Sequence, residues 1–182
     1  MKAAPAAVSE ARAAWIAAAL HALRREGVAA VRVERLAAAL GITKGSFYWH
    51  FTNRDELLDA VLEYWSREMT EIEFARVAAT DAGLAARLLA LCEDVLVRGV
   101  GRYDPAIRAW GRTDARVAQM VAQVDRRRLR VLAGFFEDGG FDAGAARTRA
   151  RLLYAFLLGE PQIGGERRAS GELGRIVAVL SR

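Results

Sequence analysis

Apolar residues recur along this 182-residue sequence with the spacing of an α-helix. Near the amino end, one helical face would carry Trp15, Ile16, Ala19, Leu20 and Leu23, and the same period continues towards the carboxyl end. No stretch alternates apolar and polar residues as a half-buried strand does. The sequence therefore predicts an all-α fold of about nine helices.

Capping residues, glycines and prolines set the expected helix boundaries. Ser9 is the expected cap of the first helix, Gly41 ends the second, Thr43 caps the third, and Asn53 with Glu56 resembles a capping box for the fourth. Pro161 cannot donate a backbone hydrogen bond, which predicts a kink or an end late in the eighth helix. The expected helices are 9–27, 33–40, 43–51, 53–74, one from about Leu84 to Val95, a short one from Asp104 through Trp110, 114–139, 142–164 and 168–182.

Charge is concentrated at the amino end. Residues 1–54 hold eight Lys or Arg and three acids, a net charge of +5, whereas residues 55–69 hold one Arg and five acids. A local excess of positive charge favours nucleic acid as a partner. We therefore expect an N-terminal domain of residues 9–69 and a second domain of residues 70–182.

Few residues in this chain suit catalysis or metal binding. Cys92 is the only cysteine, and the two histidines, His21 and His50, lie far apart. There is no glycine-rich phosphate loop and no paired-carboxylate site with a partner. A helical enzyme is therefore the weaker alternative, and we expect no cofactor and no metal. We expect Cys92 to be a buried hydrophobe rather than a redox sensor, and His21 to lie at the surface.

No run of about 18 uncharged apolar residues occurs that could span a membrane. The Ala-rich start lacks the apolar core and the cleavage site of a signal peptide. These two features predict a cytoplasmic protein with no membrane partner.

Residues 33–51, VERLAAALGITKGSFYWHF, have the pattern of a helix-turn-helix. Ala37 is small enough for two helices to cross closely, and Gly41 can adopt the positive φ of the turn. The expected small core of the motif is Leu36, Leu40, Ile42 and Phe47. Its second helix then points outward as a short rod that fits the major groove of DNA.

The sequence ITKGSFYWHF followed by TNRDELL resembles the recognition helix and the start of the fourth helix in the TetR family of transcriptional regulators. The resemblance covers Ser9 to Met69, about a third of the chain. It implies a helix-turn-helix DNA-binding domain in residues 9–69, with the motif at about 32–51, and an effector-binding and dimerisation domain in residues 70–182.

The resemblance also implies roles for individual side chains. Contacts to bases or their backbone are implied for Lys44, Gly45, Ser46 and Trp49, and contacts to phosphates for Thr43, Tyr48, His50 and Arg54. Where the family usually has Thr or Ser before the second helix, this chain has Val31 and Arg32, and we expect Arg32 to take over the phosphate contact. Phe47 and Phe51 are expected to be core.

The implied partners are double-stranded operator DNA, a second copy of the chain and a small molecule. The homodimer would form through the last two helices, and the protein would be a repressor that a ligand releases from its operator. A small, largely apolar or aromatic effector would contact Phe74, Cys92, Tyr103, Trp110, Met120 and Tyr154. Ordinary core packing explains Trp110, Met120 and Tyr154 equally well.

Two further expectations concern charge in the C-terminal part. The sequence shows no obvious buried charge partner for a ligand, and the arginines between Arg126 and Arg130 are expected to form a solvated helix face.

A non-specific architectural DNA-binding protein remains an alternative, since positive charge alone would support it. Specific readout requires base contacts from Lys44, Ser46 and Trp49.

Overall fold

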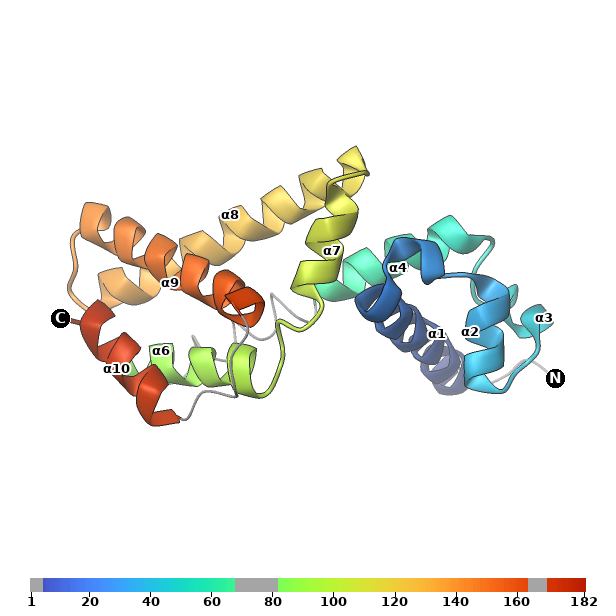
Figure 1. Cartoon of the computed structure of the whole chain (residues 1–182), viewed down its shortest axis with the longest axis horizontal. Helices are drawn as coiled ribbons and strands as arrows, with labels where there is room; N and C mark the ends of the chain where they lie inside the picture. Colours follow the sequence, from blue (N-terminus) through green and yellow to red (C-terminus); the bar gives the residue numbers. More distant parts are fainter. Residues whose placement is uncertain (1–4, 68–81, 164–169) are drawn as a thin grey trace. The chain divides into compact units, whose positions relative to one another are not determined.

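The computed structural model describes residues 5–67, 82–163 and 170–182, which form helices and connecting turns with no strand among them (Figure 1). The predicted all-α fold is confirmed. The α-helices in these residues are α1 Pro5–Glu26, α2 Val33–Leu40, α3 Lys44–Phe47, α4 Arg54–Ser66, α6 Leu84–Cys92, α7 Asp104–Gly111, α8 Ala115–Asp138, α9 Ala143–Ile163 and α10 Ser170–Leu180. A 3-10 turn, η1, spans Val28–Ala30, and a π-helical turn, η3, spans Glu93–Val97.

The chain divides into two compact units. Unit 1 comprises Met1–Ser66 and Pro105–Met120, and unit 2 comprises Arg67–Asp104 and Val121–Arg182. Helix α7 and the start of α8 thus group with the N-terminal helices. The division into functional domains at residue 69 stays a prediction.

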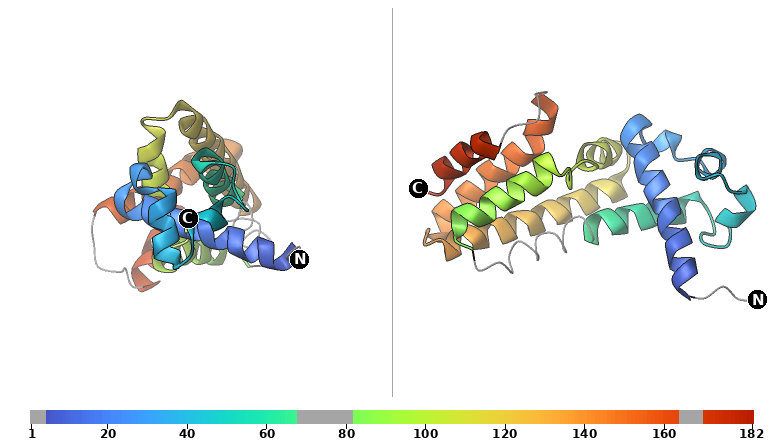
Figure 2. Two further views of the ribbon diagram at one scale, coloured as in Figure 1. Left: turned by 90° about the vertical axis from the view of Figure 1, so that its right-hand side faces the viewer. Right: turned by 90° about the horizontal axis from the view of Figure 1, so that it is seen from below.

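In unit 1, α1 packs against α2 and α4 (Figure 2). The predicted apolar face of α1 is buried, with Trp15 only 1% exposed. The helix begins at Pro5, so Ser9 lies inside it and the prediction that Ser9 caps it is wrong. Proline is accepted in a first helical turn because no intrahelical partner exists there for an N–H.

The start of α4 is stabilised by reciprocal hydrogen bonds. The backbone N–H of Glu56 donates to Oδ1 of Asn53 at 2.9 Å, and the backbone N–H of Thr52 donates to Oε2 of Glu56 at 2.6 Å. The predicted capping box therefore forms, with the amide of Thr52 in place of that of Asn53. These bonds from Thr52 lower the pKa of Glu56. The predicted end of this helix, near Phe74, lies outside the described residues.

In unit 2, α6, α8, α9 and α10 contribute side chains to one hydrophobic core. The long helices begin as predicted, because Oδ1 of Asp114 accepts the N–H of Arg116 at 3.0 Å and Oδ1 of Asp142 accepts that of Gly144 at 2.8 Å. Helix α9 continues two residues past Pro161 to Ile163. The fully buried residues of this core include Leu88, Leu91, Leu132, Phe136, Leu153 and Leu173.

Unit 2 also contains a buried ion pair. Arg128 of α8 donates to both carboxylate oxygens of Asp104, and the two side chains are each 7% exposed. Burial disfavours the Arg128 cation, but the charge of Asp104 and its hydrogen bonds outweigh this and raise the pKa of Arg128. Beside them, the hydroxyl of Tyr154 donates to Oδ1 of Asp125 at 2.7 Å.

This ion pair corrects one expectation. Arg126, Arg127 and Arg130 are exposed as predicted, but Arg128 points inward, because residues next to each other in a helix face different directions. The expectation that no buried charge partner for a ligand stands out stays a prediction, since Arg128 and Asp104 are paired with each other. Among the helices described, none is both long and apolar enough to cross a membrane.

Candidate nucleic-acid interface

The turn between α2 and α3 is built around Gly41. Its φ of +67° lies in the left-handed region that favours glycine, and the N–H of Ile42 donates to the carbonyl of Ala37 at 3.0 Å. Helix α2 spans Val33–Leu40 as predicted, and Ala37 is buried. The predicted helix-turn-helix geometry is present.

The α-helical part of the second helix is shorter than predicted. Helix α3 ends at Phe47, and the N–H groups of Tyr48, Trp49 and His50 then bond to carbonyls three residues earlier. The expected continuation of the α-helix to His50 or Phe51 is therefore wrong, although the chain keeps turning. Thr43 precedes α3 but makes no side-chain capping bond; instead Oγ of Ser46 donates to the carbonyl of Thr43 at 2.7 Å.

Phe47 anchors this segment to the rest of unit 1. It is fully buried, lies edge-on to Trp15 with ring centroids 5.1 Å apart, and stacks on Phe51 at 5.3 Å. The prediction that both phenylalanines are core is confirmed. Ile42 does not join that core, since it is 43% exposed.

The anchored segment presents two aromatic side chains to solvent. Trp49 is 86% exposed and Tyr48 is 58% exposed, and Thr43, Lys44 and Gly45 beside them are exposed as well. Large aromatic side chains normally contribute buried area. Tyr48 lies edge-on to Phe47 with ring centroids 5.3 Å apart, so Trp49 is the side chain whose place packing within unit 1 does not explain.

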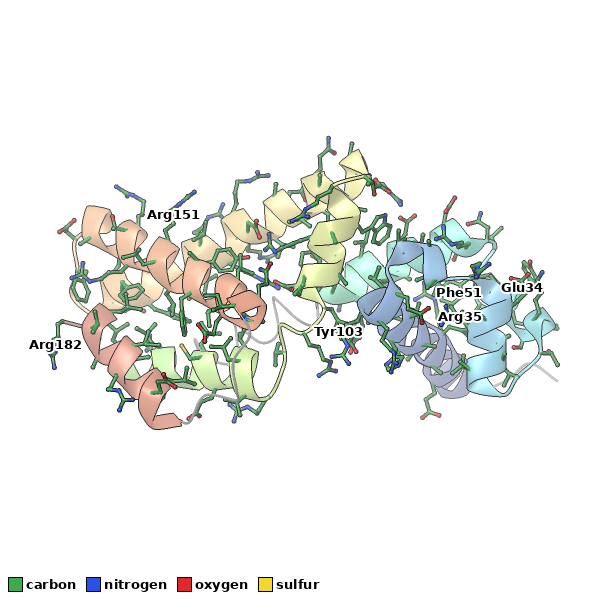
Figure 3. All side chains as sticks on the ribbon, in the orientation of Figure 1. Glu34, Arg35, Phe51, Tyr103, Arg151 and Arg182 are labelled. Carbon is green, nitrogen blue, oxygen red and sulfur yellow. The ribbon has the colours of Figure 1, made fainter. Side chains whose placement is uncertain are left out.

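The predicted cations of this region differ in their surroundings. Lys44 forms an ion pair with Glu34 of α2, which Figure 3 labels close to α3. Arg54 donates from Nε to the carbonyl of Val31 at 2.6 Å and from Nη2 to that of Val28 at 2.7 Å. Arg32 is exposed, and the described part of the chain gives it no ion pair.

Arg54 thus has a structural role that sequence reasoning missed. Its guanidinium holds the two carbonyls that border η1, the turn between α1 and α2. No local pattern signals this contact, because the partners lie 23 and 26 residues earlier. The predicted phosphate contact of Arg54 remains a prediction beside this role.

His50 is half-buried at the end of the segment. Its Nδ1 is buried and has no hydrogen-bond partner in the part of the chain that the structure describes. A contact from His50 to DNA would therefore use Nε2. His21 is exposed on α1, as predicted.

The six residues predicted to contact an effector do not fall in one unit. Trp110 and Met120 belong to unit 1, whereas Cys92, Tyr103 and Tyr154 belong to unit 2. Phe74 lies outside the described residues. Cys92 is fully buried in the unit 2 core, and burial raises the pKa of its thiol to about 12. Tyr103, labelled in Figure 3, is partly exposed before α7.

Known proteins share both the N-terminal sequence and the fold. Residues 16–61 match the sequence profile of the bacterial regulatory proteins of the tetR family. The HTH-type transcriptional regulator TtgR of Pseudomonas putida is 38% identical over 72 residues, which are 40% of this chain and 33% of that protein. The match thus spans about a third of the curated relative's length.

Two solved structures extend the similarity to most of the chain. Reduced NemR of E. coli has a TM-score of 0.74 at 19% identity and covers 93% of this chain, which in turn covers 95% of it. A transcriptional regulator from Saccharomonospora viridis in complex with choline has a TM-score of 0.71 at 17% identity, with coverages of 94% and 95%. At these identities the likeness shows a common fold. The N-terminal segment thus has the sequence profile of the tetR family, and the chain shares the fold of these solved structures.

Proposed function

We propose that this protein is a sequence-specific DNA-binding transcriptional regulator, with residues 9–69 as its DNA-binding domain. The observation that carries the proposal is the exposure of Trp49 and Tyr48, 86% and 58%, on a segment that buried Phe47 fixes in place. A rigid, exposed aromatic and polar surface at the second helix of a helix-turn-helix suits contact with base edges in the major groove.

The contacts divide into two kinds. Lys44, Gly45, Ser46 and Trp49 would read bases or lie against their backbone, and Thr43, Tyr48, His50, Arg54 and Arg32 would bind phosphates. Phosphate contacts set affinity for every sequence, whereas base contacts set preference among sequences. The two groups of substitutions therefore have different expected effects.

The test is selection of duplexes from a random library, followed by binding titrations. Lys44→Met and Trp49→Ala should change the order of preference among selected duplexes, whereas Tyr48→Ala should weaken binding to all of them. Exposed Glu63→Gln on α4 serves as a control. If no duplex is enriched by the wild-type chain, the proposed function is wrong; equal affinity for enriched and random duplexes would indicate the architectural alternative.

A homodimer through α9 and α10 is part of the proposal. Leu152 of α9 and Val179 of α10 are apolar yet 58% and 73% exposed, which is the kind of surface that a second copy would cover. Sedimentation equilibrium should give a dimer, and Leu152→Asp with Val179→Asp should weaken it. A wild-type monomer at micromolar concentration would exclude this interface.

We also propose that the protein is a repressor whose operator affinity falls when residues 70–182 bind a small, largely apolar or aromatic molecule. The S. viridis relative was crystallised with choline, which is consistent with a ligand site in this fold. Compounds that raise the unfolding temperature should be titrated against the preformed operator complex. Ligands that stabilise the protein but leave operator affinity unchanged would refute release by ligand.

A further inference from the structure

Glu34 is the acidic partner of a residue on the proposed DNA-reading surface. It lies on α2, and its carboxylate forms an ion pair with Nζ of Lys44, the first residue of α3. The side chains of Glu34 and Lys44 are 65% and 50% exposed. The hydrogen bond that Nζ of Lys44 donates to the carboxylate of Glu34 favours the ionised form of both groups, because it lowers the pKa of Glu34 and raises the pKa of Lys44.

The pairing is not needed to hold unit 1 together. Exposed ion pairs contribute little to stability, because water and salt screen both charges. Helices α2 and α3 also pack against each other, and each has a buried apolar side chain, Leu36 of α2 and Phe47 of α3, which are 2% and 0% exposed. The main effect of Glu34 is therefore on the charge that Lys44 offers to other molecules.

A carboxylate beside Lys44 has different consequences for random and for target DNA. Non-specific binding depends on cations that neutralise phosphates, and Lys44 is already neutralised by Glu34. The carboxylate would also repel a phosphate brought to the same place. In a target complex, Lys44 can exchange Glu34 for the O6 and N7 acceptors of a guanine, a gain that random sequence supplies only occasionally.

We propose that Glu34 is a specificity-determining residue, which pairs with Lys44 and so suppresses its binding to DNA phosphates while leaving it available to base acceptors. This inference rests on the proposed function. Glu34 would disfavour random DNA because its carboxylate repels phosphates beside the cation of Lys44, which attracts them. The positive charge of Arg35 on α2 is likewise paired with a carboxylate, that of Glu26 at the end of α1.

The experiment measures the affinity of the full-length chain for a random-sequence duplex and for the duplex enriched by the wild-type protein, over a series of salt concentrations. Glu34→Gln keeps the shape of the side chain and removes its charge. It should raise affinity for the random duplex about three- to tenfold, steepen the slope of log K against log salt by about one unit, and raise affinity for the enriched duplex less.

Two comparisons isolate the role of Lys44. Glu63→Gln removes an exposed acidic charge from α4 of the same unit and should leave the salt slope unchanged. In a Lys44→Met background, Glu34→Gln should have less than half its effect on the random duplex. Unfolding midpoints of all variants, which should equal that of the wild type, exclude misfolding as the cause.

Several results would overturn the inference. One is a change of less than twofold in affinity for the random duplex on Glu34→Gln, and another is an equal gain in that affinity from Glu63→Gln. A third is an effect of Glu34→Gln that is as large in the Lys44→Met background as in the wild type. Weaker binding of Glu34→Gln to both duplexes would make Glu34 a positioning or contact residue. Because the random duplex requires no known operator, these results are distinct from failure of the wild-type chain to enrich any duplex, which would refute the proposed function itself.

Discussion

Removing either partner of the buried pair between Asp104 and Arg128 should destabilise unit 2 strongly. Both side chains are 7% exposed, so the remaining charge would be left in a poorly solvated site. Loss of one partner from a buried pair costs about 3 to 5 kcal/mol. For a chain of 182 residues, this corresponds to a fall in unfolding temperature on the order of 10 °C.

The two single substitutions should differ in size. Asp104→Asn leaves a guanidinium that cannot lose its proton in this environment, so its cost should lie near 5 kcal/mol. Arg128→Met leaves a carboxylate at the first turn of α7, where the helix dipole favours a negative charge. Its cost should lie near 3 kcal/mol.

Guanidinium unfolding followed by circular dichroism measures both costs. Asp59→Asn is the matched control, because it breaks the exposed pair between Asp59 and Arg116, whose side chains are 55% and 52% exposed, and should cost less than about 1 kcal/mol. The double substitution of Asp104 and Arg128 should cost less than the sum of the single ones. Buried-pair variants no less stable than Asp59→Asn would refute the reasoning.

Three further predictions concern single residues. The thiol of Cys92, with its pKa raised to about 12, should be ionised in about one molecule in ten thousand at pH 8, so stoichiometric reaction with Ellman's reagent within minutes should require denaturant. Asp142→Ala should lower the unfolding temperature at neutral pH. Hydrogen bonds from the amides of Ala145 and Gly144 hold the pKa of Asp142 below its ordinary 3.8, so the difference in unfolding temperature from the wild type should shrink as the pH falls from about 4 to 2. A difference that stays constant over this range would contradict the capping role. Arg54→Met should lower the free energy of unfolding by about 1 to 3 kcal/mol, because its hydrogen bonds to the carbonyls of Val28 and Val31 are lost. If Arg54→Met unfolds like the wild type but binds DNA less well, Arg54 acts only at the interface.

The fold could be predicted because its signals are local. Helix α2 has the predicted bounds because Gly41 supplies a positive φ directly after the apolar face ends. Asp114 and Asp142 cap α8 and α9 with side-chain oxygens that reach amides two and three residues ahead. Ser9 misled the prediction because a capping residue also fits inside a helix when an earlier start, here at Pro5, is available.

The surface was predicted less completely, because ion pairs join distant residues. The composition of the second helix pointed to Lys44, and nothing in the sequence pointed to Glu34, ten residues earlier, as its partner. Arg54 was assigned to phosphate from the resemblance, and its bonds to the backbone of η1 became visible only in three dimensions. Its role in DNA binding stays a prediction.

The buried pair was missed for the same reason, and its position gives it a consequence beyond stability. The chain leaves unit 2 after Asp104 and returns at Val121, and Arg128 lies two turns of α8 beyond the return. The pair therefore joins, within unit 2, the residue at which the chain leaves the unit to a residue two turns beyond its return. A small molecule that altered this pair would act on the first residue of α7, on α8 and, through the bond from Arg128 to the hydroxyl of Tyr154, on the core of unit 2. At a temperature at which both variants remain folded, Asp104→Asn should therefore change operator affinity in the absence of ligand, and an affinity equal to that of Asp59→Asn would contradict this role of the pair.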